Sequence, residues 1–176
     1  PARPWFRLAT ADPELMQYAP VKQWLGDVTN LMLMVFQRSN TYRTLHMMYE
    51  ELGTFGTAAS IMTTDFDNVI HHYPLTIGEY AITTNWKGEV DTLYREFQKT
   101  VGMIVKEFGY NNCSTTVKNL YDRGSLDQWI TIIHAIEPRA DRDLSKRDAL
   151  NMPYRSVYFE IGGDQNKFLS EGGFKK

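Results

Sequence analysis

Residues 20–59 read PVKQWLGDVTNLMLMVFQRSNTYRTLHMMYEELGTFGTAA and contain two successive helical patterns. Within 21–36 the apolar residues recur at intervals of three and four, which predicts one buried face of an amphipathic helix. The dipeptide at 39–40 interrupts this spacing, and a second apolar stripe runs through 42–52. Gly53 is expected to end the second helix, because glycine readily adopts the left-handed conformation found after helices. We expect this helix pair to be the platform on which the later strands are built.

The chain after Gly56 changes to short runs rich in β-branched and aromatic residues, which are typical of strands. Runs at 58–64 and 69–75 flank turn-forming residues at 65–68, so a hairpin is predicted there. The run at 129–136 places apolar side chains on both faces, which favours a central strand. Further strands are expected at 79–83 and 154–161, with a return strand at 167–169.

Short helices are expected between the strands. A first one is expected to start at 12–14, and Thr100 and Ser114 are suited to cap two more, since their hydroxyl oxygens accept hydrogen bonds from free amide groups. Residues 90–99 fit either a helix or one face of a strand. The predicted fold class is α+β, in which an N-terminal helix pair packs on mostly antiparallel strands with short helices between strands.

The composition is that of a folded domain, with 43% hydrophobic and 23% charged residues in a chain of 176. An isolated nucleic-acid-binding domain usually carries a basic excess, and the net charge here is -2. Contact with nucleic acid through local basic patches, or within a multi-subunit assembly, remains an alternative. No apolar run approaches the roughly 20 residues of a membrane helix. Cys113 is the single cysteine, so no internal disulfide can form and a small buried role is expected for it.

The sequence offers no catalytic, cofactor-binding or metal-binding constellation. The stretch GTFG at 53–56 lacks the lysine and the strand-to-helix context of a phosphate loop. The neighbouring histidines at 71–72 point to opposite faces of a strand, so they cannot easily bind one metal. We therefore predict a protein that is not an enzyme and that holds neither cofactor nor metal. The alternative is a metal-dependent nuclease that uses Asp65, Asp67 and Glu79, because carboxylates hold the metal ions of such enzymes.

Two sets of residues are candidates for contacts with partners. The charged region at 137–148 reads as a solvated loop, and it is also the best candidate for contact with an acidic partner. Methionines in the helix pair fill a core or form an adaptable partner surface, and the second use would also suit a generic protein-binding adaptor domain. The candidate interaction loop comprises Arg139, Arg142, Lys146 and Arg147, and the candidate subunit-contact surface comprises Met34, Met47 and Met48.

Several stretches, in order along most of the chain, resemble the head-to-tail connecting (portal) proteins of short-tailed phages and prophages. The densest match lies between residues 39 and 58 and includes SNTY, Leu45, Tyr49 and LG-x-FGTA. The other matching stretches are WFRL at 5–8, VKQWL at 21–25, PL at 74–75, GEY at 78–80, VDTLYREF at 90–97, FG at 108–109 and IHAIEPR at 133–139. The family pattern also favours a strand at 90–99.

The resemblance implies a structural subunit of a closed homo-oligomeric ring, typically a dodecamer, at one vertex of the capsid shell. The ring forms the channel for DNA packaging and genome ejection, and it docks the terminase packaging motor and later the tail or adaptor proteins. Double-stranded DNA passes through without sequence-specific binding, and no membrane is involved. The implied location is the virion, with assembly in the host cytoplasm.

The start of the chain, PARPW, lacks an initiator methionine and the apolar core of a signal peptide, which favours a fragment of a longer protein. Under the family resemblance, residues 1–139 correspond to a wing-like α+β domain. Residues 140–176 correspond to a loop and strand hairpin that lead toward the stem and clip. The long channel helix, the tunnel loop and the C-terminal crown of the family are expected outside this stretch. Part of the apolar surface of the helix pair is then expected to be exposed here and covered by a neighbouring subunit or by a missing segment.

Overall fold

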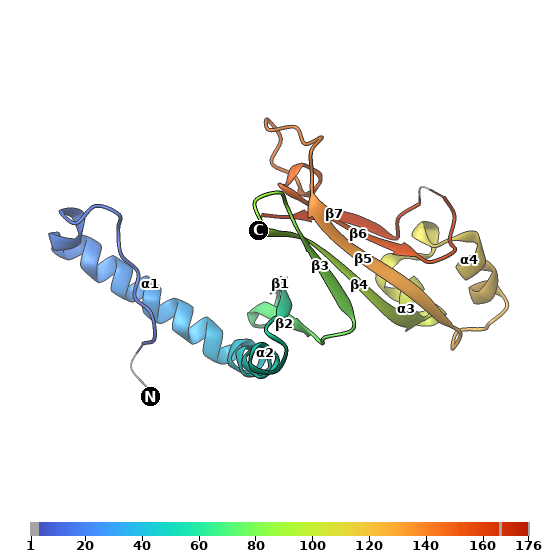
Figure 1. Cartoon of the computed structure of the whole chain (residues 1–176), viewed down its shortest axis with the longest axis horizontal. Coiled ribbons are helices and arrows are strands. Elements are labelled where there is room, and N and C mark those ends of the chain that lie inside the picture. The colour runs from blue at the N-terminus through green and yellow to red at the C-terminus, as the bar shows by residue number, and fades with distance from the viewer. Residues whose placement is uncertain (1–3, 166, 176) are drawn as a thin grey trace. The chain divides into compact units, whose positions relative to one another are not determined.

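The structure is a computed structural model that describes residues 4–165 and 167–175. The chain forms two compact units, Pro1–Ile77 and Gly78–Lys176, which are described separately below (Figure 1). The boundary between these units lies at residue 77. Strands on both sides of residue 139 belong to the same sheet. The assignment of a wing to residues 1–139 stays a prediction.

The first unit contains the predicted helix pair. A short 3-10 helix, η1 (Leu15–Gln17), precedes α1 (Ala19–Arg38) and α2 (Thr41–Phe55). Asn40 lies between the two long helices, where the sequence predicted the break. The predicted end of α2 at Gly53 was wrong by three residues. It is Gly56 that takes the left-handed conformation, with φ of 76°, and its amide donates to the Leu52 carbonyl.

An extended N-terminal segment covers the buried side of α1. The backbone amide of Leu8 donates to Thr29 Oγ1 at 3.4 Å, and Thr29 in turn donates to the Leu25 carbonyl of its own helix at 2.7 Å. The rings of Trp5 and Phe36 stack with centroids 6.2 Å apart. Of the apolar stripe predicted from spacing, Leu25 is buried, whereas Trp24 and Leu31 are largely exposed. The other buried residue of α1 is Thr29, one turn after Leu25.

The hairpin of β1 (Ala59–Asp65) and β2 (Val69–Leu75) packs against α2, as Figure 1 shows. Asn40 pairs with the backbone of His72 through two hydrogen bonds: its Nδ2 donates to the carbonyl at 2.7 Å, and its Oδ1 accepts from the amide at 2.9 Å. The His72 ring lies 3.0 Å from Thr41 Oγ1. These contacts, with Leu75 buried at 2% exposure, confirm that the helix pair packs on antiparallel strands.

The second unit is a five-stranded antiparallel sheet in the order β3-β4-β5-β6-β7, with β5 in the centre as predicted. Residues 90–100 form a strand, because they pair with neighbours on both sides. The return strand begins at Ser170, so its predicted place at 167–169 was wrong: Leu169 turns into the core, and Lys167 donates to the Cys113 carbonyl. The strands are β3 (Tyr80–Thr84), β4 (Val90–Thr100), β5 (Trp129–Pro138), β6 (Tyr154–Glu160) and β7 (Ser170–Phe174).

Two short helices, α3 (Val101–Phe108) and α4 (Thr115–Asp122), gather near one end of this sheet (Figure 1). Thr100 and Ser114 cap them as predicted, by accepting from the amides of Met103 and Val117. Two further 3-10 turns, η2 (Tyr110–Asn112) and η3 (Ala149–Asn151), lie in the loops.

The core of the second unit forms where α3 and α4 meet the sheet. All its buried members lie within this unit. Cys113 is fully buried there, as expected for a small structural side chain. The buried cluster consists of Val101, Ile104, Cys113, Val117, Ile132 and Leu169.

Candidate assembly surfaces

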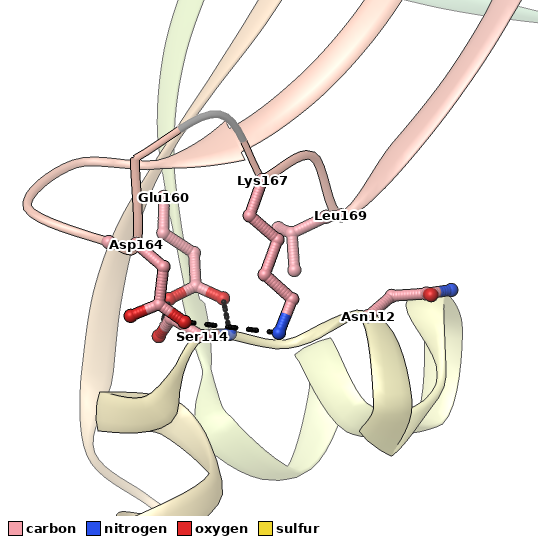
Figure 2. Close-up of a pocket in the computed structure, with 7 residues that line it drawn as sticks. Asn112, Ser114, Glu160, Asp164, Lys167 and Leu169 are labelled. Atoms are coloured by element: carbon pink, nitrogen blue, oxygen red, sulfur yellow. Dashed lines mark hydrogen bonds and ion pairs between the residues drawn. The ribbon is translucent and has the colours of Figure 1, made fainter.

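A small polar pocket lies where the loop after β6 meets the start of α4 (Figure 2). The Glu160 carboxylate accepts from the amide of Ser114 at 3.0 Å and from its hydroxyl group. Asp164 Oδ2 accepts from the amide of Thr115 at 3.0 Å and from its hydroxyl at 3.1 Å. Both carboxylates thereby stabilise the amide-rich end of the helix. The pocket measures about 10 Å³, which leaves room for one water at most. These groups therefore have a structural role and hold the loop after β6 against the start of α4.

A buried histidine lies in the middle of the sheet. His134 is fully buried, its Nε2 lies 2.9 Å from Ser156 Oγ, and its ring stacks on Tyr158 with centroids 3.9 Å apart. Burial, with a smaller effect from the Arg95 charge, lowers the pKa of His134 to about 4. The imidazole is therefore neutral near pH 7, and it joins adjacent strands as part of the packing.

Arg139, the first residue of the candidate interaction loop, is anchored to the sheet. Its Nη2 donates to Glu171 Oε1 at 3.0 Å and to the Gly172 carbonyl at 3.2 Å, and its side chain is only 8% exposed. Glu171 also pairs with Arg155 Nε at 3.3 Å, and Arg155 lies 3.8 Å from Glu137. A side chain so engaged holds the loop in place and offers little surface to a partner.

The remaining basic residues of this loop, Arg142, Lys146 and Arg147, are exposed. The loop nevertheless has a defined shape: the amide of Asp143 donates to Asn151 Oδ1 at 2.8 Å, and the amide of Ser145 donates back to Asp143 at 3.0 Å. Hydrogen bonds from the Ser145 hydroxyl and, to a smaller extent, the Ser145 amide lower the pKa of Asp143. The three basic side chains are thus presented on a structured surface loop.

The candidate subunit-contact surface lies on the two long helices. Met34 and Met47 are 45% and 41% exposed, while Met48 is partly buried. The expectation that the helix pair leaves apolar surface exposed is confirmed, and what covers this surface stays a proposal. Exposed apolar side chains that gather into a patch mark sites of association. Other large exposed apolar side chains on α1 and α2 are Trp24, Leu31, Tyr42, Tyr49, Leu52 and Phe55.

The acidic residues of the nuclease alternative lie at a strand end and in the loops next to strands. Asp65 accepts from the Asn68 amide at 3.2 Å and from the Asn68 side chain at 3.1 Å, which organises the hairpin turn. Asp67 lies in the same turn, and Glu79 lies just before β3 in the other unit. Within residues 4–165 and 167–175, no group of three or more His, Cys, Asp and Glu side chains could hold a metal ion.

The structure adds two features that sequence reasoning missed. Phe66 stands fully exposed at the hairpin turn, and Trp5 forms a groove with residues of α2. The sequence did carry a signal for the exposed Phe66, because this aromatic residue stands between two aspartates in a predicted turn. The groove had no local signal, since its walls come from distant parts of the sequence. Over the described residues, no helix is both long enough and apolar enough to cross a membrane.

Comparison with known proteins places the chain in a family. A family model for the bacteriophage head to tail connecting protein matches residues 1–176, and the chain belongs to this family. The chain is 63% identical over 175 residues to the probable portal protein of Bordetella phage BPP-1, covering 99% of this chain and 32% of that protein. It is 49% identical over 174 residues to the portal protein of Salmonella phage epsilon15, covering 99% of this chain and 31% of that protein. The chain therefore spans about a third of the length of these curated relatives.

Proposed function

We propose that this chain is part of a structural subunit of a phage portal, the ring that connects head and tail at one capsid vertex. The observation that carries the proposal is the family match over 1–176, together with two relatives named as portal proteins. The exposed apolar surface on α1 and α2 supports it, because a subunit of an assembly keeps such surface for its neighbours.

In this proposal the ring forms the channel for DNA packaging and ejection, and it contacts the packaging motor, the capsid shell, and the tail or adaptor proteins. Residues 1–139 contribute to the outer wing, and 140–176 lead toward the stem and clip. The net charge of -2 supports a passage that does not hold DNA tightly, because strong phosphate neutralisation would slow a moving duplex. The role is structural, in a virion assembled in the host cytoplasm.

The test uses the full-length protein that contains this chain. Size-exclusion chromatography with mass measurement is expected to show a large closed oligomer, and negative-stain images are expected to show rings with a central channel. A protein that stays monomeric across salt and protein concentrations, with no ring in any image, would contradict the proposal. Cleavage of DNA in Mg²⁺ or Mn²⁺ that Asp65→Ala abolishes would instead favour the nuclease.

A further inference from the structure

The side chain of Asn40 attaches the β1–β2 hairpin to the helix pair in the manner of an extra strand. Its Nδ2 donates to the His72 carbonyl at 2.7 Å, and its Oδ1 accepts from the His72 amide at 2.9 Å. Because β2 pairs with β1 along its other edge, these backbone groups of His72 lie on the edge of β2 that carries no strand. A planar amide with one donor and one acceptor offers His72 what a residue of a neighbouring strand would offer. We call this pair of hydrogen bonds the clasp.

The clasp diverts Asn40 from the usual task of a residue in its position. Asn40 is the N-cap of α2, yet its side chain makes no capping hydrogen bond. Asparagine is among the preferred N-caps, where its side-chain oxygen accepts from the second or third amide of the helix, here that of Tyr42 or Arg43. In this structure the same oxygen is engaged by the His72 amide. Asn40 therefore has two alternative partners, the backbone of His72 and the start of its own helix.

A second polar contact holds the same strand near its other end. The amide of Ile77, which follows β2, donates to Glu51 Oε1 at 3.3 Å. The 11 residues from Asn40 to Glu51 span about 16 Å of helix, and the five residues from His72 to Ile77 span about 17 Å of extended chain. Since the two lengths agree, β2 runs along α2 and is attached near both ends.

The two attachments differ in their surroundings. Leu75, beside the Ile77 contact, is buried at 2% exposure, whereas Asn40 and His72 are only partly buried. A third polar contact at the clasp joins Thr41 Oγ1 and the His72 ring at 3.0 Å. Water competes for hydrogen bonds between partly buried groups, which keeps their net contribution small. The clasp end thus depends on hydrogen bonds, whereas the other end also has a buried leucine.

Backbone strain lies between the clasp and the hairpin turn. Val69 has a φ of 72°, a left-handed conformation that a β-branched residue rarely adopts. Such a conformation persists only where surrounding contacts hold it. Val69 is three residues from His72, so the clasp is one of the contacts that fix this segment. The strain therefore favours release of the clasp.

We propose that Asn40 is a reversible clasp with two internal partners. In the closed state its side chain holds His72, and in the open state the same side chain caps α2 while the turn end of the hairpin swings away. Leu75 and the contact between Ile77 and Glu51 keep the other end attached, so the hairpin moves about that end. Capping α2 offsets part of the cost of the lost hydrogen bonds, because it satisfies an amide at the helix start. This device belongs to the first unit and does not depend on the proposed function.

The experiment compares amide hydrogen exchange, followed by mass spectrometry, in the full-length protein and in three variants of it. Asn40→Asp keeps an oxygen that can cap α2 but cannot donate to the His72 carbonyl, and Asn40→Ala removes both functions. Asn30→Asp is the matched control, because it makes the same chemical change at an exposed position of α1. Far-UV circular dichroism checks that each variant folds.

Both Asn40 variants are expected to speed exchange at residues 69–73 by about 10-fold, the effect of losing one or two hydrogen bonds, while Leu75 and Ile77 exchange as in wild type. Asn40→Asp should also slow exchange of the Tyr42 and Arg43 amides, because the freed carboxylate caps them, and Asn40→Ala should not. The control Asn30→Asp should match wild type throughout.

Three results would overturn parts of this inference. Unchanged exchange at residues 69–73 in both Asn40 variants would show that Asn40 does not hold the hairpin. Exchange that rises equally at residues 69–73, Leu75 and Ile77 would show that the hairpin leaves α2 as a whole and does not swing. Unchanged exchange at Tyr42 and Arg43 in Asn40→Asp would remove the helix start as the second partner.

Discussion

The contact between β7 and η3 is so close that a single methyl group should disrupt it. A Cβ added at Gly173 would lie nearest to the Ala149 carbonyl oxygen, and 2.8 Å from both Met152 Cβ and the Tyr154 carbonyl oxygen. These distances are well inside van der Waals contact, and two of the three obstructing atoms are backbone. The change Gly173→Ala is therefore expected to push the loop of residues 139–153 off the edge strand.

The expected cost of Gly173→Ala is about 1–3 kcal/mol, the range for overpacking a close-packed site. In a unit of this size that corresponds to a loss of roughly 4–8 °C in Tm for each kcal/mol. The matched control is Gly172→Ala, because its added Cβ would meet nothing within 4 Å. The control should be neutral or should stabilise by up to about 1 kcal/mol, through reduced freedom of the unfolded chain.

Two measurements check this reasoning. Urea unfolding should give a lower midpoint with an unchanged slope for Gly173→Ala. Trypsin should cleave faster at Arg142, Lys146 and Arg147, because the displaced loop exposes its backbone. If Gly173→Ala matched Gly172→Ala in both stability and tryptic cleavage, the close contact would not constrain the loop as argued.

Three further predictions follow from single sites. Val69→Gly should raise the free energy of unfolding by about 1 kcal/mol, because glycine relieves the left-handed strain, and chemical denaturation would reveal no gain if the strain were absent. The His134 pKa of about 4, against the ordinary histidine value of 6.5, means that the unfolded state binds more protons between these values. Stability should therefore fall by about 3 kcal/mol as pH drops from 6.5 to 4, and an equally steep loss in His134→Gln would refute this cause. Met34→Asp and Met47→Asp in the full-length protein should reduce self-association, measured by analytical ultracentrifugation. Met48→Asp should instead lower the free energy of unfolding, because Met48 is partly buried. If Met34→Asp and Met47→Asp associate as strongly as wild type, these two side chains do not belong to the contact surface.

Local sequence patterns predicted most of the helices and strands. The apolar spacing of 21–36 predicts a helix with one face toward a core, and α1 is that helix. Its buried residues are Leu25 and Thr29. Apolar residues on both faces of 129–136 needed cover on both sides, and β5 lies in the centre of the sheet. The helix caps at Thr100 and Ser114 could be predicted from the sequence, because a capping side chain bonds to an amide within one turn of the same helix.

Residues 90–99 show where local spacing was insufficient. The same side chains suit a helix or a strand, and pairing of β4 with both β3 and β5 selects the strand. The end of α2 was misplaced for a related reason. Both Gly53 and Gly56 can adopt the left-handed conformation, and the chain turns at the second, where the hairpin begins to pack on the helix.

The sequence by itself determined the α+β class, the helix pair, the hairpin and the family, because these depend on periodicity and on the order of short motifs. Tertiary structure alone decided which candidate residues are available to partners. Arg139 reads like its basic neighbours, yet Glu171 and Gly172, more than 30 residues away, hold it against the sheet. Trp5 and Tyr49 likewise form one groove only because the N-terminal segment folds back on the helices. Burial and proximity between distant residues arise when the chain packs, so no local pattern records them.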